Sequence, residues 1–597
     1  MSTDINQGRI IDVLNKYLKA NNFPFQMNRN GICNGLAIVH AKYVLEGRSK
    51  EFENILKYIS EGKRDNNITD EDINNFAFQT LLAFAPHEFD NKLHQATAMR
   101  ALKIKGIPLS SSFNFCMAAS KTNWAQALQD IALKEDEVMI VGSINHAISI
   151  HKANGHYVVY DPNYSNGFKK FADEAALVKE LHSNVFHFSN ENLGLEVQIL
   201  RHPEKQKEER VFPTVEDLYK KYLPDAKEIS ECGDQLFNTL SAAAAHNDKS
   251  VIEYLIQRGA DNYAEASMSA VKSNNVSALE SLLAHIDKEP QMFAIWDYAL
   301  SLGRKEIIDL LKQDTKFKAF YEEYLPAEAF LSAIASGKNA DLLEEFIKDY
   351  KAVALENAQK DFVAQKEQLE DQFSPDALVK YIQGIPENID SELSKLILGQ
   401  SKYSNSKNPS PMSNTINSGD VQSVRILMEQ VLSSGAELTD EQKIAYLLEA
   451  IRSNRRSVAN FLISEKPGIA KELMKTVNLS LYAVEHTNIL LLRDLQRHGV
   501  EFNNAALKLI DRKESKELTF VESLGIAIQK FADFFKDLVD YKAKGVRYDV
   551  RLFKSVKQEL QEAKEAQENI EIIIDSFEPV EPVVDDNQTG ESRLILS

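Results

Sequence analysis

The stretch that decides the fold of the N-terminal region is Glu137-Val-Met-Ile-Val-Gly-Ser-Ile-Asn-His146-Ala-Ile-Ser-Ile-His-Lys-Ala-Asn-Gly155-His-Tyr-Val-Val-Tyr-Asp161-Pro-Asn163. Two runs rich in β-branched and aromatic residues flank its Asn154-Gly155 dipeptide. Asn-Gly is typical of the tight two-residue turn that joins antiparallel strands, because both central residues of that turn need a positive φ. The stretch therefore predicts a β-hairpin that turns at Asn154-Gly155.

The turn also fixes which residues of the two strands face each other. Ala153 is expected opposite His156, and the same register places His146 opposite Asn163. Side chains alternate between the two faces of a strand, so His146 and Asp161 fall on one face as diagonal neighbours. We therefore predict that the Asp161 carboxylate lies close enough to orient the His146 imidazole.

A thiol with suitable surroundings occurs far upstream, in Gly31-Ile-Cys33-Asn-Gly35-Leu. The following residues, 34–46, carry apolar side chains at helical spacing and end at Gly47, which predicts a mostly buried helix with Cys33 at its N-terminus. A helix N-terminus and a neighbouring imidazolium both favour the thiolate, which is the nucleophilic form of cysteine.

Attack by a thiolate on a carbonyl also needs hydrogen-bond donors for the developing oxyanion. The nearest donors in the sequence are the backbone N–H groups around Cys33 and the side-chain amide of Asn28. Gln26 is the substitute if the loop is arranged differently.

A more ordinary interpretation exists for each of these residues, because a cysteine on an apolar helix is usually a small core residue. Cys116 and Cys232 have no comparable partners in the sequence, and we predict structural roles for both. His151 and His156 flank the turn and are expected in solvent. The remaining histidines show no ligand spacing with cysteine or carboxylate, so we predict neither a metal site nor a cofactor.

Three motifs together resemble those of a known family. Gly31-x-Cys33-x-Gly35-Leu36, His146-Ala147 and Asp161-Pro162-Asn163 resemble the Cys, His and Asp motifs of the YopT/AvrPphB-type papain-like cysteine proteases, which bacterial pathogens inject into host cells. The resemblance covers about the first 200 residues. It implies that Cys33 is the nucleophile, His146 the general base and Asp161 its orienting residue, and that the Asn28 amide lines the oxyanion hole.

Composition narrows the class of protein further. The chain has 597 residues, with 44% hydrophobic and 26% charged residues, which is ordinary for a soluble protein of several domains. Three cysteines cannot form a disulfide framework, so a reducing compartment is expected. The N-terminus lacks the layout of a Sec signal peptide, and no apolar run is long enough for a transmembrane segment. A net charge of −19 argues against nucleic acid as the partner.

The predicted architecture is multidomain. Residues 1–200 are expected to form an α+β papain-like cysteine protease domain, with helices over 1–20 and 50–135 and strands over 137–200. Residues 201–235, which are charged and lack periodicity, are predicted as a linker.

An all-α solenoid is expected to follow. Its unit is a short helix with small residues, a polar or glycine turn and a second helix, as in Ala242–Asp261. Turn positions such as Gly303 and Gly337 suit the ankyrin period of about 33 residues. We predict ankyrin-like repeats over 236–348 and 406–512, separated by a helical insertion and loop over 349–405. Other α-solenoids of paired helices remain an alternative.

Two C-terminal helices are predicted over 513–577 and a disordered acidic tail over 578–597. A capping helix pair is favoured over a coiled-coil dimer because heptads are not sustained, so a monomer is expected. Acidic residues before a short apolar C-terminus resemble the export signal of type IV-secreted, Legionella-type ankyrin effectors. A plain solvated terminus has the same composition.

These features lead to three functional hypotheses. The first is a bacterial effector that moves from the bacterial cytoplasm to the host cytoplasm or nucleus, where its Cys-His-Asp hydrolase acts on a host protein bound by the repeats. The second is a protein-binding scaffold without turnover. The third is an acyltransferase that uses the same site, since an amine can resolve a thioester in place of water. Residues from about 236 to 512 are expected to fold and bind the partner without the N-terminal domain.

Overall fold

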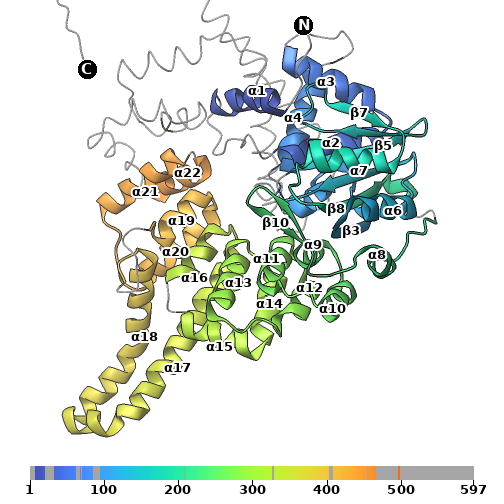
Figure 1. Cartoon of the computed structure of the whole chain (residues 1–597). Helices are drawn as coiled ribbons and strands as arrows, with labels where there is room; N and C mark the ends of the chain where they lie inside the picture. Colours follow the sequence, from blue (N-terminus) through green and yellow to red (C-terminus); the bar gives the residue numbers. More distant parts are fainter. Residues whose placement is uncertain are drawn as a thin grey trace, which may run out of the picture. The chain divides into compact units, whose positions relative to one another are not determined.

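The computed structural model describes residues 7–20, 32–61, 68, 70–84, 86, 95–144, 146–206, 209–325, 328–401, 408–453, 455–465, 495 and 497. Within these residues, helices and strands alternate as far as residue 238, and helices alone follow (Figure 1). None of the helices among them is long and apolar enough to cross a membrane.

One antiparallel sheet of six strands organises the N-terminal region, in the order β3-β8-β4-β5-β6-β7. The last strand of this sheet in chain order, β8, lies between β3 and β4 and pairs with both. The sheet is therefore complete only when residue 201 is included. The strand bounds are β3 (Ser111–Ser120), β4 (Glu137–Gly142), β5 (Ala147–Ala153), β6 (His156–Tyr160), β7 (Phe168–Phe171) and β8 (Asn192–Arg201), with a separate short pair β1 (Lys103–Ile104) and β2 (Ile107–Pro108).

The β5–β6 hairpin has the predicted turn and register. Ala153 pairs with His156 and Ser149 with Tyr160. Asn154 and Gly155 both have positive φ, 52° and 76°, as a two-residue turn that matches the twist of the strands requires. The local turn chemistry thus sets the pairing of these two strands.

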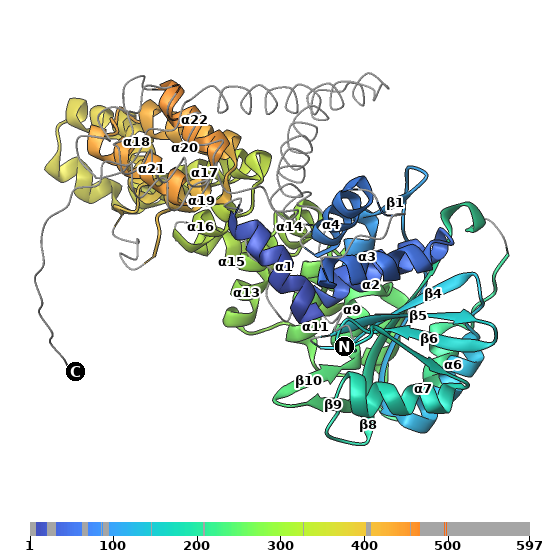
Figure 2. The same ribbon diagram turned by 90° about the horizontal axis from the view of Figure 1, so that it is seen from above.

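Helices cover both faces of the sheet (Figures 1 and 2). The helix α2 packs on β4 and β5, supported by α3 and α4. On the opposite face α6 contacts β3 and β8, and α7 packs against α6 and contacts β7. The bounds are α1 (Gln7–Ala20), α2 (Cys33–Leu45), α3 (Ser49–Glu61), α4 (Asp70–Phe84), the 3₁₀-helix η1 (Gln95–Ala101), α6 (Lys121–Ile131), α7 (Glu174–Glu180) and the π-helical turn η2 (Leu181–Val185).

The sequence predicts several helices within residues 50–135 and strands only from residue 137, so the strand β3 at Ser111–Ser120 was not anticipated. Its second half, Cys116 to Ala119, is buried on both faces of the sheet. A short apolar run of this kind shows no alternation, so its periodicity does not distinguish a buried strand from a buried helix.

Two close contacts seat α2. A Cβ added to Gly35 would lie 3.0 Å from the backbone N of Phe84 and 3.1 Å from the carbonyl O of Thr80, so only glycine allows α2 to approach α4 this closely. On the sheet side, His40 Nδ1 and Ser149 Oγ are 2.7 Å apart and both residues are fully buried. Glycine packing and this hydrogen bond together hold α2 against β5.

Residues 203–246 contain further elements that contact both the sheet and the helices that follow. Thr239 Oγ1 accepts a hydrogen bond of 3.0 Å from the backbone N–H of Ala118 in β3, and Asn123 Nδ2 donates to the carbonyl of Tyr222. The segment predicted as a linker therefore includes packed secondary structure. The bounds are η3 (Pro203–Lys205), α8 (Val215–Tyr222), β9 (Ile229–Cys232), β10 (Gln235–Asn238) and α9 (Thr239–His246).

From α9 onward, consecutive helices form antiparallel pairs that stack in two rows. The helices α9, α11, α13, α16, α19 and α21 contact one another in succession, and so do α10, α12 and α14. The bounds are α10 (Lys249–Gln257), α11 (Tyr263–Ser273), α12 (Val276–Leu283), α13 (Glu289–Ser301), α14 (Lys305–Gln313), α15 (Thr315–Tyr324), α16 (Glu328–Ser336), α19 (Pro411–Ser418), α20 (Val421–Ser433), α21 (Asp440–Arg452) and α22 (Arg456–Glu465).

Two much longer helices interrupt this series. α17 (Ala340–Gln372) and α18 (Pro375–Ile397) pair with each other and form a helical hairpin at the predicted insertion (Figure 1). The N-terminal part of α17 packs on α16, and α18 leads back to α20. Apart from residues 495 and 497, the predicted repeats beyond residue 465, the C-terminal helices over 513–577 and the tail over 578–597 lie outside the described residues.

Candidate active site

Cys33 is the first residue of α2 and is 5% exposed. The preceding residue, Ile32, has no side chain that can cap the helix, so the first-turn N–H groups are left to other acceptors. The sequence folds this way because Asn34 to Leu45 is apolar enough to be buried on nearly every side. A thiol therefore stands at the positive end of a buried helix.

His146 and Asp161 form a buried hydrogen-bonded pair. His146 Nε2 donates to Asp161 Oδ1 at 2.8 Å, and the two residues are 8% and 1% exposed. His146 directly precedes β5 and Asp161 directly follows β6, so the hairpin register brings them together. This is the diagonal arrangement expected from the sequence.

Cys33 lies close enough to the imidazole to contribute to the raised pKa of His146. Because Asp161 occupies Nε2, the nitrogen that faces the sulfur is Nδ1. Burial lowers the pKa of His146, but the hydrogen bonds and negative charges of Asp161 and Cys33 outweigh it and raise the pKa to about 9. At neutral pH the ring is therefore an imidazolium, with the Asp161 carboxylate at Nε2 and Cys33 nearby.

The Asp161 carboxylate is held in place by the loop that follows it. Its Oδ1 also accepts a hydrogen bond of 2.8 Å from the backbone N–H of Asn163. The backbone N–H of Asp161 donates to Gly167, and the N–H of Tyr164 donates back to the Asp161 carbonyl, both at 3.0 Å. The Asp-Pro-Asn motif thus works as a turn that aims one carboxylate oxygen at His146. The Asn163 amide lies 3.4 Å from Nε2, in contact with the pair.

The other two cysteines lie elsewhere. Cys116 is in β3, is 1% exposed and has a pKa raised by burial and by the nearby Glu196 carboxylate. Cys232 is partly exposed in β9, where its thiol donates to the carbonyl of Phe186 at 3.1 Å. Neither is placed beside an imidazole. Asn28 and Gln26, proposed for the oxyanion hole, lie outside the described residues.

Two other histidines lie behind the triad and stay neutral. Burial lowers the pKa of His40 well below its usual value, and the nearby His151 lowers it further. Burial and the Lys170 charge lower the pKa of His151 to about 4. The expectation that His151 is solvated is wrong, because its ring packs 5.5 Å from that of His40 under α2. His156 is exposed, as expected.

Sequence reasoning missed one neighbour of the catalytic pair. The ring of Phe186 packs on the ring of His146, with centroids 5.8 Å apart and planes at 61°. Phe186 belongs to the run Val185-Phe-His-Phe, which lies within the range 137–200 where strands are predicted. The structure instead has a π-helical turn that ends at Val185, followed by His187 with a positive φ of 53°. No local pattern indicates such a turn.

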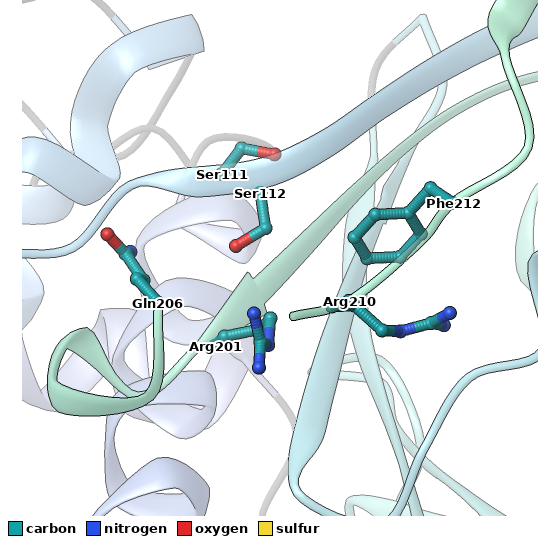
Figure 3. A pocket seen from close by; sticks show the side chains of 6 residues that line it. All are labelled: Ser111, Ser112, Arg201, Gln206, Arg210 and Phe212. Atoms are coloured by element: carbon teal, nitrogen blue, oxygen red, sulfur yellow. The ribbon is translucent and has the colours of Figure 1, made fainter. Parts of the chain in front are cut away.

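A hollow of about 290 Å³ lies at the far end of β8, away from the triad (Figure 3). The buried carboxylate of Glu137 accepts a hydrogen bond of 2.7 Å from Arg210 Nε beside it. The hollow includes none of the three triad residues. It is lined by Ser111, Ser112, Arg201, Gln206, Arg210 and Phe212.

No group of three or more histidine, cysteine or acidic side chains is arranged to hold a metal ion in the described part of the chain. A thiol at a helix N-terminus, an imidazolium and an orienting carboxylate are the parts of a nucleophilic cysteine site.

The comparison with known proteins agrees with this site. Residues 12–184 match the model of the Peptidase_C58 family, described as Yersinia/Haemophilus virulence surface antigen. No curated protein matches the chain, and no solved structure matches it. The matched range includes Cys33, His146 and Asp161. This similarity supports a cysteine-protease-like domain over residues 12–184.

Proposed function

We propose that the chain is a papain-like cysteine protease with Cys33 as nucleophile, His146 as general acid and base, and Asp161 as the residue that orients His146. The single observation that supports this assignment is the buried His146–Asp161 hydrogen bond, with the first residue of α2, Cys33, near enough to the same imidazole to raise its pKa. Each member is buried, so water competes little with these interactions.

The first half of the proposed reaction forms an acyl-enzyme. The Cys33 thiolate attacks the carbonyl carbon of a peptide bond, and the negative charge moves to the carbonyl oxygen. The backbone N–H of Cys33 and the amide of Asn28 are the proposed donors to that oxygen. The amine then leaves with the proton held by His146, and a thioester to Cys33 remains.

The second half releases the acyl group. Neutral His146 takes a proton from water, which attacks the thioester and returns Cys33 as thiolate. The Asp161 hydrogen bond keeps Nδ1 directed at the reacting atoms during both transfers. If an amine enters in place of water, the same steps give an acyltransferase, which is the second candidate reaction.

The test of this function is turnover of a fluorescence-quenched peptide library by the full chain. We expect Cys33-dependent cleavage that falls at least a thousandfold in Cys33→Ala, because no other thiol has an imidazole partner in the described residues. Cys116→Ala is the matched control and should keep the wild-type rate. Product masses separate hydrolysis from acyl transfer. Absence of any Cys33-dependent product would instead favour the protein-binding scaffold.

The paired helices after residue 238 are proposed as an ankyrin-like solenoid that recruits a host protein. Side chains at the start of second helices bond to backbone carbonyls of the preceding pair. Asn275 Nδ2 donates to the Asn247 carbonyl at 2.7 Å, and Arg304 donates to the Lys272 carbonyl at 2.8 Å. Such recurring bonds between neighbouring pairs support a repeat architecture, in which stacked units form an extended binding surface.

The helical hairpin of α17 and α18 carries much of the exposed apolar surface. Of the ten large hydrophobic residues exposed in the described parts of the chain, six lie on this hairpin or its turn. A gathering of this kind is typical of protein-binding surfaces. The six are Leu355, Val363, Phe373, Val379, Tyr381 and Ile382.

Recruitment is tested by a pull-down from host-cell extract, in which the full chain carrying Cys33→Ala is the bait and the amount of host partner recovered is measured. Adding Val363→Glu and Val379→Glu should reduce recovery at least tenfold without changing the melting temperature, since the two valines are 71% and 52% exposed. Leu432→Glu, 52% exposed on α20, is the matched control. Residues 210–597 should recover the same protein. Recovery that requires residues 1–200 and is unchanged by the valine substitutions would contradict the proposal.

The biological setting proposed for these activities is that of a secreted bacterial effector. Its path runs from the bacterial cytoplasm, by a type IV system, to the host cytoplasm or nucleus. The description of the matched family as a virulence surface antigen supports this proposal. A monomer is proposed for the working state.

A further inference from the structure

The region beyond the family match reaches back to the proposed active site. The match ends at residue 184, inside the π-helical turn Leu181–Val185. Two residues later, the ring of Phe186 packs on His146. Phe186, and the β9–β10 hairpin that contacts its segment, therefore lie beyond the residues that the family match includes.

Phe186 is held from both sides of its backbone. Its N–H donates to the carbonyl of Leu181 at 3.0 Å, which closes the π-helical turn. Its carbonyl accepts the Cys232 thiol at 3.1 Å. His187, next in the chain, has φ of 53°, a left-handed conformation that surrounding contacts must maintain in a residue other than glycine. The side chain of Phe186 is 2% exposed.

The support for Phe186 comes from the β9–β10 hairpin. Beside Cys232, the carbonyl of Glu231 accepts the backbone N–H of Ser189 at 2.9 Å. On the other strand, Phe237 packs so closely on Gly194 of β8 that a Cβ there would lie 2.3 Å from the phenylalanine ring. The hairpin is thus seated on β8 at one strand and bonded to the Phe186 segment at the other. β10 leads directly into α9, the first helix of the paired series.

We propose that Phe186 is a positioning residue for the Cys33–His146–Asp161 site, and that the β9–β10 hairpin holds it there through Cys232. This inference rests on the proposed thiol hydrolase function. The groups that act on His146 are Asp161 and Asn163 after β6 and Cys33 on α2, and each binds an edge of the ring. Phe186 contributes the apolar surface that keeps the ring from turning away from those partners and keeps water from their hydrogen bonds.

The inference is tested in the full chain with two thiol reagents. Iodoacetamide reacts with the thiolate alone. Ethyl vinyl sulfone forms an S–C bond to Cys33 as its C=C bond opens, and the resulting carbanion takes the proton of the His146 imidazolium. Phe186→Ala should lower the vinyl sulfone rate about ten- to a hundredfold and the iodoacetamide rate much less. A displaced imidazolium weakens stabilisation of the thiolate in both reactions, but only the vinyl sulfone reaction also loses its proton donor.

Two variants separate positioning from loss of packing. Phe115→Ala removes an equally buried ring that packs on Trp124 and Tyr219, so it should leave the ratio of the two rates unchanged. Phe186→Leu keeps an apolar side chain beside His146, so it should restore most of the wild-type ratio of the vinyl sulfone rate to the iodoacetamide rate. Cys232→Ala should lower the vinyl sulfone rate about two- to fivefold, whereas Cys232→Ser keeps a donor to the Phe186 carbonyl and should restore it.

The pH profile gives an independent reading. If the His146 ring moves away from Asp161 and Cys33 in Phe186→Ala, it loses the interactions that raise its pKa, so the pKa that governs the vinyl sulfone reaction should fall from about 9. Equal rate ratios and pH profiles for Phe186→Ala and Phe115→Ala would overturn the inference about Phe186. Equal vinyl sulfone rates for Cys232→Ala and wild type would overturn the role proposed for the β9–β10 hairpin. Failure of the proposed function is a different result, in which wild-type Cys33 reacts no faster than Cys232.

Discussion

Cys33 should be alkylated by iodoacetamide at pH 6 far faster than either other cysteine of the folded protein. The thiolate is the reacting form, and the His146 imidazolium together with the N-terminus of α2 stabilises it on Cys33. Burial raises the pKa of Cys116, which keeps that thiol protonated, and it also shields the sulfur from the reagent. We expect Cys116 to remain unlabelled while Cys33 reacts completely.

His146→Ala should slow alkylation of Cys33 at pH 6 about tenfold or more, because it removes the positive charge beside the sulfur. The control is His156→Ala, since His156 is exposed at the hairpin turn and touches no triad residue. Peptide mapping by mass spectrometry measures all three cysteines in one experiment. Equal labelling of Cys33 and Cys232 in the folded protein, unaffected by His146→Ala, would contradict the ion pair and favour the scaffold hypothesis.

Asp161→Ala should reduce peptide turnover at pH 7.5 about a hundred- to a thousandfold and move the upper limb of its pH profile downward. In the wild type the limb is expected near pH 9, where His146 loses its proton. Without the carboxylate, burial becomes the dominant influence and lowers the pKa of His146. Initial rates between pH 5 and 10 measure both effects.

Two controls sharpen this prediction. Asp161→Asn keeps an acceptor for Nε2–H but not the negative charge, so its rate should fall between those of wild type and Asp161→Ala. Asp130→Ala removes a surface carboxylate paired with Lys221 and should leave the profile unchanged. An Asp161→Ala enzyme with the wild-type rate and the wild-type upper limb would show that Asp161 does not orient His146.

The proton on His146 also makes the unfolding free energy of the protein depend on pH. The folded protein holds the His146 proton up to a pKa of about 9, whereas an unfolded imidazole loses it near 6.5. The stabilisation is therefore fully present below about pH 6.5 and is lost as the pH rises through about 9. The difference in unfolding free energy between wild type and Asp161→Ala should shrink accordingly over that range.

The sequence alone determined the features that depend on neighbouring residues. Asn154-Gly155 set the turn and hence the register of β5 and β6, because only residues that accept positive φ fit there. That register placed His146 near Asp161 before any tertiary contact was considered. The apolar run after Cys33 likewise predicted α2, which begins at Cys33 as expected.

Only the tertiary structure decided which distant segments meet at the site. The burial of β3 on both faces and the insertion of β8 beside it follow from packing among elements far apart in the chain, which local periodicity does not encode. The contact of Phe186 with His146 depends on a π-helical turn and on Cys232, 46 residues away. The packing of Gly35 on α4 and the hydrogen bond between His40 and Ser149 likewise depend on the tertiary structure. Such contacts arise when whole elements pack together, and no single segment of the sequence specifies them.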